Sequence, residues 1–231
     1  MRNTSEEHHK IITEIKEFLK AHHEAGLEWT RLPERCLCPA ILAALQESAR
    51  QCTRCRLSAS RTRVVFGEGD PRARLLFIGE APGAEEDRTG RPFIGRAGEL
   101  LTKIIEAIGL SRDQVYISSV VKCRPPENRA PEQDEIAACK PFLIKQIQAI
   151  QPAVICTLGT VSTQVILNTR DPITKCRGKF YDVHGIRVMP TFHPAYLLRN
   201  PKDKKLVWED MQRIQALYQT LVSDRTDSRE A

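Results

Sequence analysis

Residues 74–98 read RLLFIGEAPGAEEDRTGRPFIGRAG, an apolar run that passes directly into a loop rich in glycine and charge. The apolar run predicts a buried strand, because a strand covered by helices on both faces carries continuous rather than alternating apolar residues. The last twenty positions of the stretch hold five glycines, four acids and three arginines. In an open parallel sheet, ligands bind beyond the carboxyl ends of the strands. We therefore expect a binding site in this loop.

Further apolar runs predict three more strands, and helical patterns separate them. The four expected strands lie at residues 75–78, 115–121, 153–158 and 186–192, and the expected helices lie at 97–109, 132–150, 160–167 and 205–222. Strands that alternate with helices at this spacing form a parallel sheet with helices on both faces. The sequence thus predicts an α/β fold, a three-layer α/β/α sandwich around a four-stranded parallel sheet. The strand ends converge on one rim, which is the expected site.

The amino-terminal part differs in pattern from this α/β region. Residues 8–25 carry apolar side chains at helical spacing, and a second helical pattern begins at residue 40, after Pro33 and Pro39. The expected organisation is an N-terminal helical extension over residues 1–48, an α/β domain over residues 49–224 and a polar tail over residues 225–231.

Composition limits the class of protein. The chain has 231 residues, of which 41% are hydrophobic, and no apolar run of the length that crosses a membrane. Its start lacks the unbroken apolar segment of a secretory signal, so we expect a cytoplasmic protein without a membrane partner. The 35 basic and 29 acidic side chains give a net charge of +6, which is compatible with a polyanionic partner.

Two common nucleotide-binding motifs are absent from the sequence. The glycine-rich loop contains no G-x-G-x-x-G, and no G-x-x-x-x-G-K-[ST] occurs anywhere, so neither a Rossmann dinucleotide site nor a Walker phosphate loop is supported. Gly95 and Gly98 precede an expected helix and could still offer backbone N–H groups to a phosphate. The alternative is that the glycines serve a long loop that needs positive φ angles.

The eight cysteines are the second signal. Cys52 and Cys55 form a C-x2-C pair, whereas Cys123 and Cys139 stand singly, and four thiolates suit a [4Fe–4S] cluster or a tetrahedral zinc ion. The absence of a second close pair favours iron–sulfur, and four unrelated buried thiols remain an alternative. Cys156 lies in an apolar run and is expected to be a buried thiol. Three cysteines stay unassigned, with the C-x-C pair as a possible ligand pair: Cys36, Cys38 and Cys176.

Together these stretches resemble the family 4 uracil-DNA glycosylases, the iron–sulfur branch of the uracil-DNA glycosylase superfamily. The resemblance covers about residues 49–220 and rests on CTRC at 52–55, GEAPGAEEDRTGRPFIGRAG at 79–98, VVKCRPPENRAPE at 120–132, Cys139 and HPAYLLR at 193–199. It implies a monofunctional glycosylase that hydrolyses the N-glycosidic bond of deoxyuridine in DNA and leaves an abasic site for base excision repair. It also implies a monomer, associated with a prokaryotic nucleoid, that acts on single- or double-stranded DNA.

The resemblance assigns roles to individual residues. The implied catalytic residues are Glu80, Glu86 and His193; the implied base-binding residues are Ala81, Phe93, Ser119 and Asn128; the implied DNA-binding residues are Arg63, Tyr196, Leu197, Leu198 and Arg199; and the implied ligands of a [4Fe–4S] cluster are Cys52, Cys55, Cys123 and Cys139.

These residue types suit the chemistry. A stacked uracil must be flipped into a pocket, where Phe93 would stack on it. His193 would donate to the uracil oxygen on which charge develops, and so stabilise the transition state more than the ground state. Glu80 and Glu86 would serve the cationic sugar and the attacking water. The neighbouring Glu85 and Asp87 are expected to be solvated loop acids.

Two comparisons with the family refine this interpretation. Members commonly carry asparagine where this chain has Ser119, and a rotatable hydroxyl reads the base edge less strictly than an oriented amide, so other deaminated bases could be accepted. A related branch that becomes covalently trapped on its substrate has a basic, histidine-bearing insertion, which residues 124–138 lack. Ordinary turnover is therefore expected.

Two other functions remain open at this point. One is a non-catalytic iron–sulfur module that binds nucleic acid, which the loss of the asparagine would fit. The other is a metal-stapled nucleotide-binding domain that resembles a piece of a phage polymerase. The presence of Glu80 and His193 favours the glycosylase over both.

Overall fold

The computed structural model describes residues 34–227. The helix expected over residues 8–25 lies outside the described residues, as does most of the expected polar tail. The described part of the α/β region begins with α2 (Glu34–Arg50), which starts earlier than expected and continues through Pro39. From residue 37 onward this helix belongs to the same compact unit as the rest of the chain, and Leu42 and Ala49 are buried in its core. The division at residue 48 stays a prediction.

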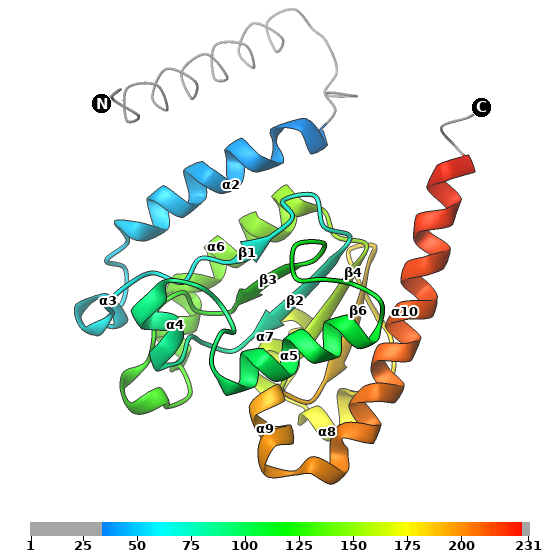
Figure 1. The fold of residues 1–231 in the computed structure, drawn as a ribbon. Coiled ribbons are helices and arrows are strands. Elements are labelled where there is room, and N and C mark those ends of the chain that lie inside the picture. Colours follow the sequence, from blue (N-terminus) through cyan, green and yellow to red (C-terminus); the bar gives the residue numbers. More distant parts are fainter. Residues whose placement is uncertain (1–33, 228–231) are drawn as a thin grey trace, which may run out of the picture. The chain divides into compact units, whose positions relative to one another are not determined.

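A six-stranded mixed sheet forms the centre of the molecule (Figure 1). Its strands are β1 (Glu68–Gly69), β2 (Leu75–Gly79), β3 (Tyr116–Ser119), β4 (Val154–Leu158), β5 (Tyr181–Val183) and β6 (Ile186–Thr191), in the spatial order β1-β3-β2-β4-β6-β5. The prediction of a four-stranded parallel sheet needs correction. The four expected strands are its parallel centre, and β1 and β5 add short antiparallel edges. Strands of two and three residues are too short to give a recognisable periodic pattern.

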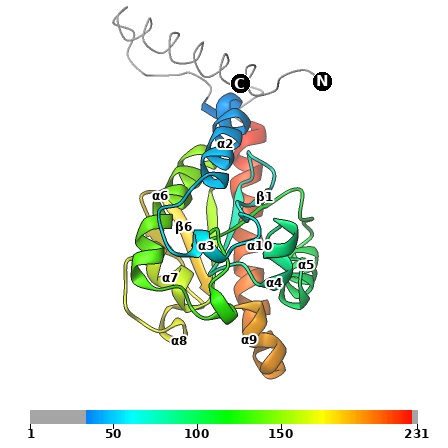
Figure 2. The ribbon, with the colours of Figure 1, turned by 90° about the vertical axis from the view of Figure 1, so that its left-hand side faces the viewer.

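Helices cover both faces of this sheet (Figures 1 and 2). After α2 these are α3 (Leu57–Ser60), α4 (Ala84–Thr89), α5 (Arg96–Ala107), α6 (Gln133–Ile150), α7 (Thr160–Leu167), α8 (Ile173–Cys176), α9 (Pro194–Arg199) and α10 (Lys204–Asp227), with 3-10 turns η1 (Pro126–Asn128) and η2 (Pro201–Asp203). No helix of the described residues is long and apolar enough to span a membrane.

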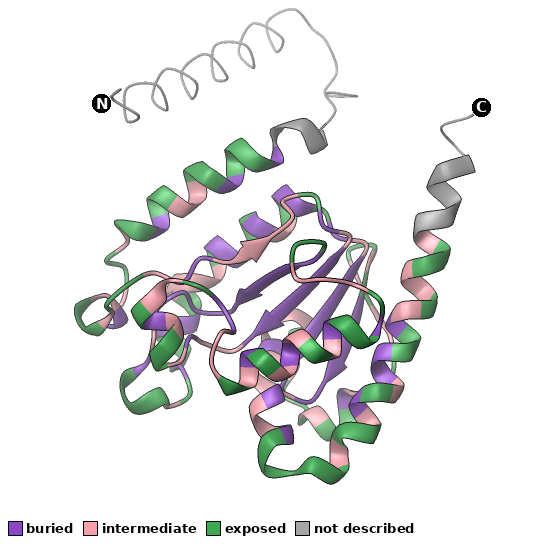
Figure 3. Cartoon of the chain, in the orientation of Figure 1, coloured by how far each residue is buried: buried purple, intermediate pink, exposed green. Residues whose placement is uncertain are grey.

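Alternation along the strands divides the core in two. In β2, Leu76 and Ile78 pack with residues of α2 and α6, whereas Leu75 and Phe77 pack with residues of α5 and α10. This follows from the period of two in a strand, which sends successive side chains to opposite faces. All five residues of β2 are buried, as are those of β3 and β4 (Figure 3). The continuous apolar run that predicted a doubly covered strand therefore has that structure.

Candidate active site

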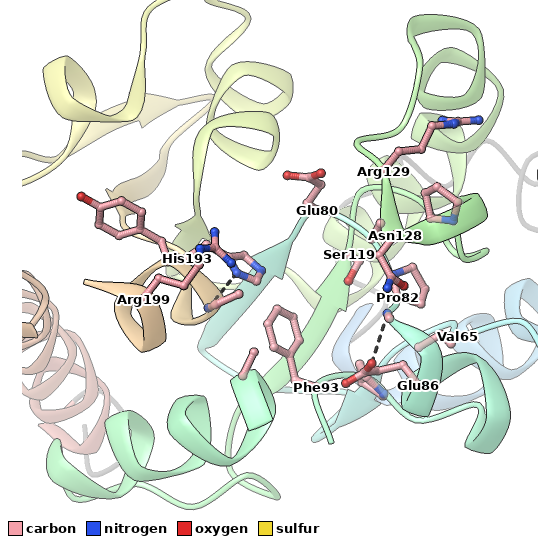
Figure 4. A pocket seen from close by; sticks show the side chains of 17 residues that line it. Val65, Glu80, Pro82, Glu86, Phe93, Ser119, Asn128, Arg129, His193 and Arg199 are labelled. Carbon is pink, nitrogen blue, oxygen red and sulfur yellow. Dashed lines mark hydrogen bonds between the residues drawn. The ribbon is translucent and has the colours of Figure 1, made fainter. Parts of the chain in front are cut away.

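A cavity of about 410 Å³ opens at the carboxyl edge of the central strands (Figure 4). It lies where the rim was expected, with Glu80 following β2, Ser119 ending β3 and His193 following β6. The glycine-rich loop supplies much of the wall, and Gly159, after β4, approaches the side chain of His193 closely. A cavity of this size is typical of a small-ligand site. Of the expected catalytic and base-binding residues, all line it: Glu80, Glu86, His193, Ala81, Phe93, Ser119 and Asn128.

Phe93 lies in this cavity in a conformation that two glycines make possible. Its φ of 50° lies in the left-handed region, which is costly for an aromatic residue. A Cβ atom on Gly79 would overlap the Phe93 ring, and one on Gly98 would overlap the Phe93 backbone. Gly79 and Gly98 thus leave the space that the ring and the backbone of Phe93 occupy.

Arg112 fixes the backbone of Phe93 from behind. Its guanidinium donates to the carbonyl oxygen of Phe93 at 3.0 Å and to that of Pro92 at 2.8 Å. The arginine side chain is 19% exposed and lies 3.7 Å from Glu68, which also binds Arg91. The sequence gives no signal for this role, because Arg112 stands in a polar turn before β3 and reaches its partners only in the folded chain.

His193 is the N-cap residue of α9. Its Nδ1 accepts a hydrogen bond from the Ala195 N–H at 3.1 Å, so in the neutral ring the proton is on Nε2. Burial, together with a smaller contribution from the nearby Arg199, lowers the pKa of His193 to about 4. The imidazole is therefore a neutral donor at physiological pH. Its ring centroid lies 5.6 Å from that of Phe93.

The two glutamates of the cavity differ in their surroundings. Within the described residues the carboxylate of Glu80 has no hydrogen-bond partner, and burial raises its pKa. The carboxylate of Glu86 accepts from the backbone N–H groups of Ile94 at 2.9 Å, Gly95 at 3.0 Å and Gly83 at 3.1 Å. Glu86 thus joins the two ends of the loop, and its catalytic role stays a prediction.

The opposite wall carries the residues expected to read the base edge. Ser119 is 3% exposed, and its carbonyl oxygen accepts from the ammonium of Lys122 at 2.8 Å. Asn128 lies at the rim with a left-handed φ of 56°, and its Oδ1 accepts from Arg124 at 2.8 Å. The side-chain NH2 of Asn128 is then the group left to donate.

Lys122 is a buried cation that sequence reasoning passed over. Its ammonium donates to Ser118 Oγ and Gln146 Oε1, each at 2.6 Å, and burial lowers its pKa to about 8. A lysine inside the apolar run VVKC was the available signal, because lysine is rarely buried without partners. It stands between Ser119, which lines the cavity, and Cys123.

A second network joins the cavity wall to the C-x2-C segment. Arg129 lines the cavity and donates to Glu135 at 2.6 Å, and Arg56, next to Cys55, donates to the same carboxylate at 3.1 Å. The Glu135 side chain is fully buried, and its hydrogen bond with Arg129 holds its pKa near 2. This network ties the loop at residues 125–129 to the cysteine-bearing segment.

The four expected ligand cysteines line one small cavity, of about 20 Å³. Arg61 donates to the Cys123 sulfur at 3.3 Å, and the Lys122 backbone N–H donates to that of Cys139 at 3.3 Å. Between residues 34 and 227 no three His, Cys, Asp or Glu side chains have the arrangement of a closed metal site. The donor set fits a four-thiolate group: four thiols on one cavity, with N–H donors aimed at two sulfurs.

The other described cysteines are placed separately. Cys156 is fully buried in β4, as expected. Cys38 is 1% exposed, and its thiol donates to the Ala149 carbonyl at 2.7 Å. Cys176 is also buried, and the side chain of Cys36 is not described. Nothing in this part of the chain supports the C-x-C pair as ligands.

Two expectations at the rim need correction. Leu197, expected to contact DNA, is 1% exposed and packs in the core, so it positions α9 instead. Asp87, expected to be solvated, is 4% exposed and accepts from the backbone N–H groups of Thr62 and Arg63. Leu198 is 37% exposed.

The remaining residues expected to bind DNA lie at or near the cavity. Arg63 is exposed, and Arg199 is exposed at the cavity rim. Tyr196 also lines the cavity, where its ring stacks on that of Phe192 and its hydroxyl donates to Asp203 at 2.6 Å.

The carboxyl edge of this α/β sheet thus carries an aromatic ring, a neutral imidazole and a half-buried carboxylate around one cavity, an arrangement typical of an enzyme site for a small ligand. Comparison with known proteins identifies the family. The family model of the uracil DNA glycosylase superfamily matches residues 66–212. The chain belongs to this superfamily and, within it, to the type-4 branch.

Three relatives carry the assignment to the branch. A Type-4 uracil-DNA glycosylase of Sulfurisphaera tokodaii is 49% identical over 185 residues, which are 76% of this chain and 84% of the relative. A Type-4 uracil-DNA glycosylase of Saccharolobus solfataricus is 46% identical, over 75% of this chain and 84% of the relative. One of Thermotoga maritima is 47% identical, over 75% of this chain and 92% of the relative.

Proposed function

We propose that the chain removes uracil from DNA as a monofunctional glycosylase, hydrolysing the N-glycosidic bond and leaving an abasic site for base excision repair. The observation that carries this proposal is the joint placement of a neutral His193, the Phe93 ring and the half-buried Glu80 around one cavity. The names of the relatives support the same activity. A module that only binds nucleic acid has no need of this arrangement.

The flipped uracil stacks on Phe93, whose backbone Arg112 holds in place. As the glycosidic bond breaks, negative charge develops on the uracil oxygens. The Nε2–H of His193 donates to the oxygen O2, and this hydrogen bond strengthens as the charge grows. Because the pKa of His193 is near 4, the base departs as an anion and the imidazole does not protonate it.

The sugar develops cationic character in the same step, and water attacks it. Glu80 is the first candidate to stabilise this cation and to orient the water, since its carboxylate has no hydrogen-bond partner in the described residues. Glu86 faces the same cavity, but three backbone N–H groups already bind its carboxylate. We propose that Glu86 also contributes to catalysis, because it holds the two ends of the loop that carries Phe93.

Ser119, Asn128 and the backbone at Ala81 read the base edge. A serine hydroxyl donates or accepts as the base requires, so we propose that discrimination against other deaminated bases is relaxed. DNA binding involves Arg63, Tyr196, Leu198 and Arg199, with Leu198 as the exposed apolar residue that can occupy the space of the flipped base. The proposed setting is a monomer in the prokaryotic cytoplasm, at the nucleoid.

Cys52, Cys55, Cys123 and Cys139 would hold a [4Fe–4S] cluster. When bound, the cluster supplies a cross-link between the C-x2-C segment, the loop after β3 and α6, and glycosidic hydrolysis needs no electron from it. The charge-transfer absorption of the purified protein in the visible range distinguishes a cluster from zinc, which is colourless.

The test uses labelled oligonucleotides with a single U, hypoxanthine, xanthine or C, and alkali to reveal abasic sites. Abasic sites at U that disappear in the His193→Ala variant are the expected result. Activity on hypoxanthine or xanthine measures how far recognition is relaxed. If no substrate yields abasic sites while the visible absorption is intact, the glycosylase assignment fails and the binding module replaces it.

A further inference from the structure

A second cavity, of about 390 Å³, lies on the other side of the segment that borders the base cavity. Three parts of the chain form it: α2, the segment at residues 61–64 and the end of α4. The residues that line it are Gln46, Arg50, Arg61, Thr62, Arg63, Val64, Thr89 and Gly90.

The lining of this cavity is strongly cationic. It contains three arginines and, among the described residues, no acidic side chain. The guanidinium of Arg63 has no hydrogen-bond or ion-pair partner within residues 34–227, and Arg50 pairs only with Glu47 on the exposed surface of α2. The hydroxyl group of Thr62 adds a further donor, whereas that of Thr89 already donates to the Glu85 carbonyl oxygen at 2.8 Å. Arginine forks and hydroxyls are the groups that bind phosphate oxygens.

Hydrogen bonds within the protein hold two of the lining residues, Arg61 and Thr62. Arg61 donates to the carbonyl oxygens of Cys52 at 2.7 Å and Arg50 at 2.9 Å, and also to the Cys123 sulfur. The buried carboxylate of Asp87 accepts the N–H group of Thr62 at 3.0 Å. A preformed site of this kind binds without the entropic cost of ordering a loop.

Two segments of the chain each carry residues that line both cavities, so the cavities lie close together. Val65 lines the base cavity and Val64 lines the second one, and consecutive Cα atoms are about 3.8 Å apart. In α4, Glu86 lines the first cavity and Thr89 the second, which corresponds to a rise of about 4.5 Å along a helix. The second cavity is therefore within reach of the strand whose nucleotide would occupy the first.

We propose that the second cavity binds a backbone phosphate of the uracil-bearing strand, next to the flipped nucleotide. This inference rests on the proposed function, because it takes the DNA strand as the source of the phosphate. Arg50 and Arg63 bind the phosphate oxygens, and Arg61 fixes the floor while joining this site to the cysteine cavity.

The experiment measures single-turnover excision from oligonucleotides with one U, as a function of DNA and salt concentration. Arg50→Gln and Arg63→Gln are each expected to raise the half-saturating DNA concentration about tenfold at low salt. Each should also reduce the slope of log affinity against log salt by about 0.7–0.9, the value of one lost phosphate contact. Arg72→Gln, a matched loss of one arginine at the opposite edge of the sheet, should leave both quantities unchanged.

A second series locates the phosphate. Each backbone phosphate around the uracil is replaced in turn by an uncharged methylphosphonate. One position is expected at which the neutral linkage weakens the wild type but adds nothing to the loss in Arg63→Gln. If every position weakens both proteins equally, or if both variants keep the wild-type salt slope, the proposal is overturned.

The outcomes separate this inference from the proposed function. If the wild type shows no excision that depends on His193, the proposed function is overturned. If the wild type excises uracil but Arg50→Gln and Arg63→Gln keep its salt slope, only the phosphate site is overturned. A site for free phosphate would show itself differently. Inorganic phosphate alone would then raise the melting temperature of the wild type, but not of Arg63→Gln, with no coupled position in the methylphosphonate series.

Discussion

Arg112 donates to the carbonyl oxygen of Phe93 at 3.0 Å and so holds the aromatic side chain of the base cavity from a point 19 residues further along the chain. The left-handed backbone of Phe93 needs such a partner, because this conformation costs about 1–3 kcal/mol on its own. The ring is therefore positioned by a charged residue that does not itself line the cavity.

Substitution of Arg112 should impair excision through Phe93. Arg112→Lys keeps the charge but lacks the planar fork whose two nitrogens donate to the two carbonyl groups, so kcat/KM should fall about 10- to 100-fold. Because stacking is weakened before the chemical step, the loss should be mainly in KM. The control is Arg91→Gln, which removes an exposed partner of the same Glu68. Wild-type kinetics in Arg112→Lys would show that Phe93 needs no such support.

His193 should stay neutral well below the usual histidine pKa. Burial lowers its pKa to about 4, so between pH 6.5 and 4 the unfolded chain takes up a proton that the folded chain does not. This residue therefore makes the free energy of unfolding decrease as pH falls through that range. Nitrogen-15 NMR of the imidazole should report one Nε2–H tautomer down to about pH 5. A titration near pH 6.5 contradicts the prediction.

Glu80 should set the acid limb of the pH–rate profile. Burial raises its pKa above the ordinary value of 4.5, and the ionised form is the one that can stabilise a cationic sugar. The rate should fall as pH drops through this raised pKa. Glu80→Gln should lower the single-turnover rate about 10²- to 10⁴-fold and abolish that limb.

The matched variant Glu86→Gln separates the two glutamates. It should lower the melting temperature, because Glu86 accepts three backbone hydrogen bonds, while its pH profile keeps the acid limb. An acid limb that vanishes in Glu86→Gln and persists in Glu80→Gln would exchange their roles.

Ser119→Asn should sharpen base selection. An amide fixed at the end of β3 offers one donor and one acceptor in set positions, whereas the hydroxyl rotates. The ratio of excision rates for U over hypoxanthine should rise about tenfold, which is the effect of one hydrogen bond that uracil can make and hypoxanthine cannot. Ser118→Ala, which alters the neighbouring buried serine bound by Lys122, is the control for general disturbance of β3. An unchanged ratio would place base discrimination elsewhere in the cavity.

Sequence patterns predicted the elements that are long and the residues that form motifs. The four parallel strands are four to six residues long and lie in mostly apolar stretches, whereas β1 and β5 have two and three residues and are too short to stand out. Phe93 and His193, which both line the cavity, could be singled out because each belongs to a recognisable stretch. Arg112 and Lys122 could not, since their roles depend on contacts that only the folded chain creates.

The error at Leu197 has a similar origin. In a helix of six residues, neighbouring leucines give no clear periodicity, so the sequence does not tell which of Leu197 and Leu198 faces the core. Asp87 likewise belongs to a run of acids in which only one is buried, and its partners are the backbone N–H groups of Thr62 and Arg63.

The contact between Gly79 and the ring of Phe93 also limits how this sequence can diverge. A Cβ atom at position 79 would overlap the ring where it now lies, so the identities of the two residues are linked. A descendant that acquires alanine at position 79 must move the ring of Phe93 or replace it with a smaller side chain. Covariation of these two positions would therefore mark lineages in which this wall of the cavity has been rebuilt.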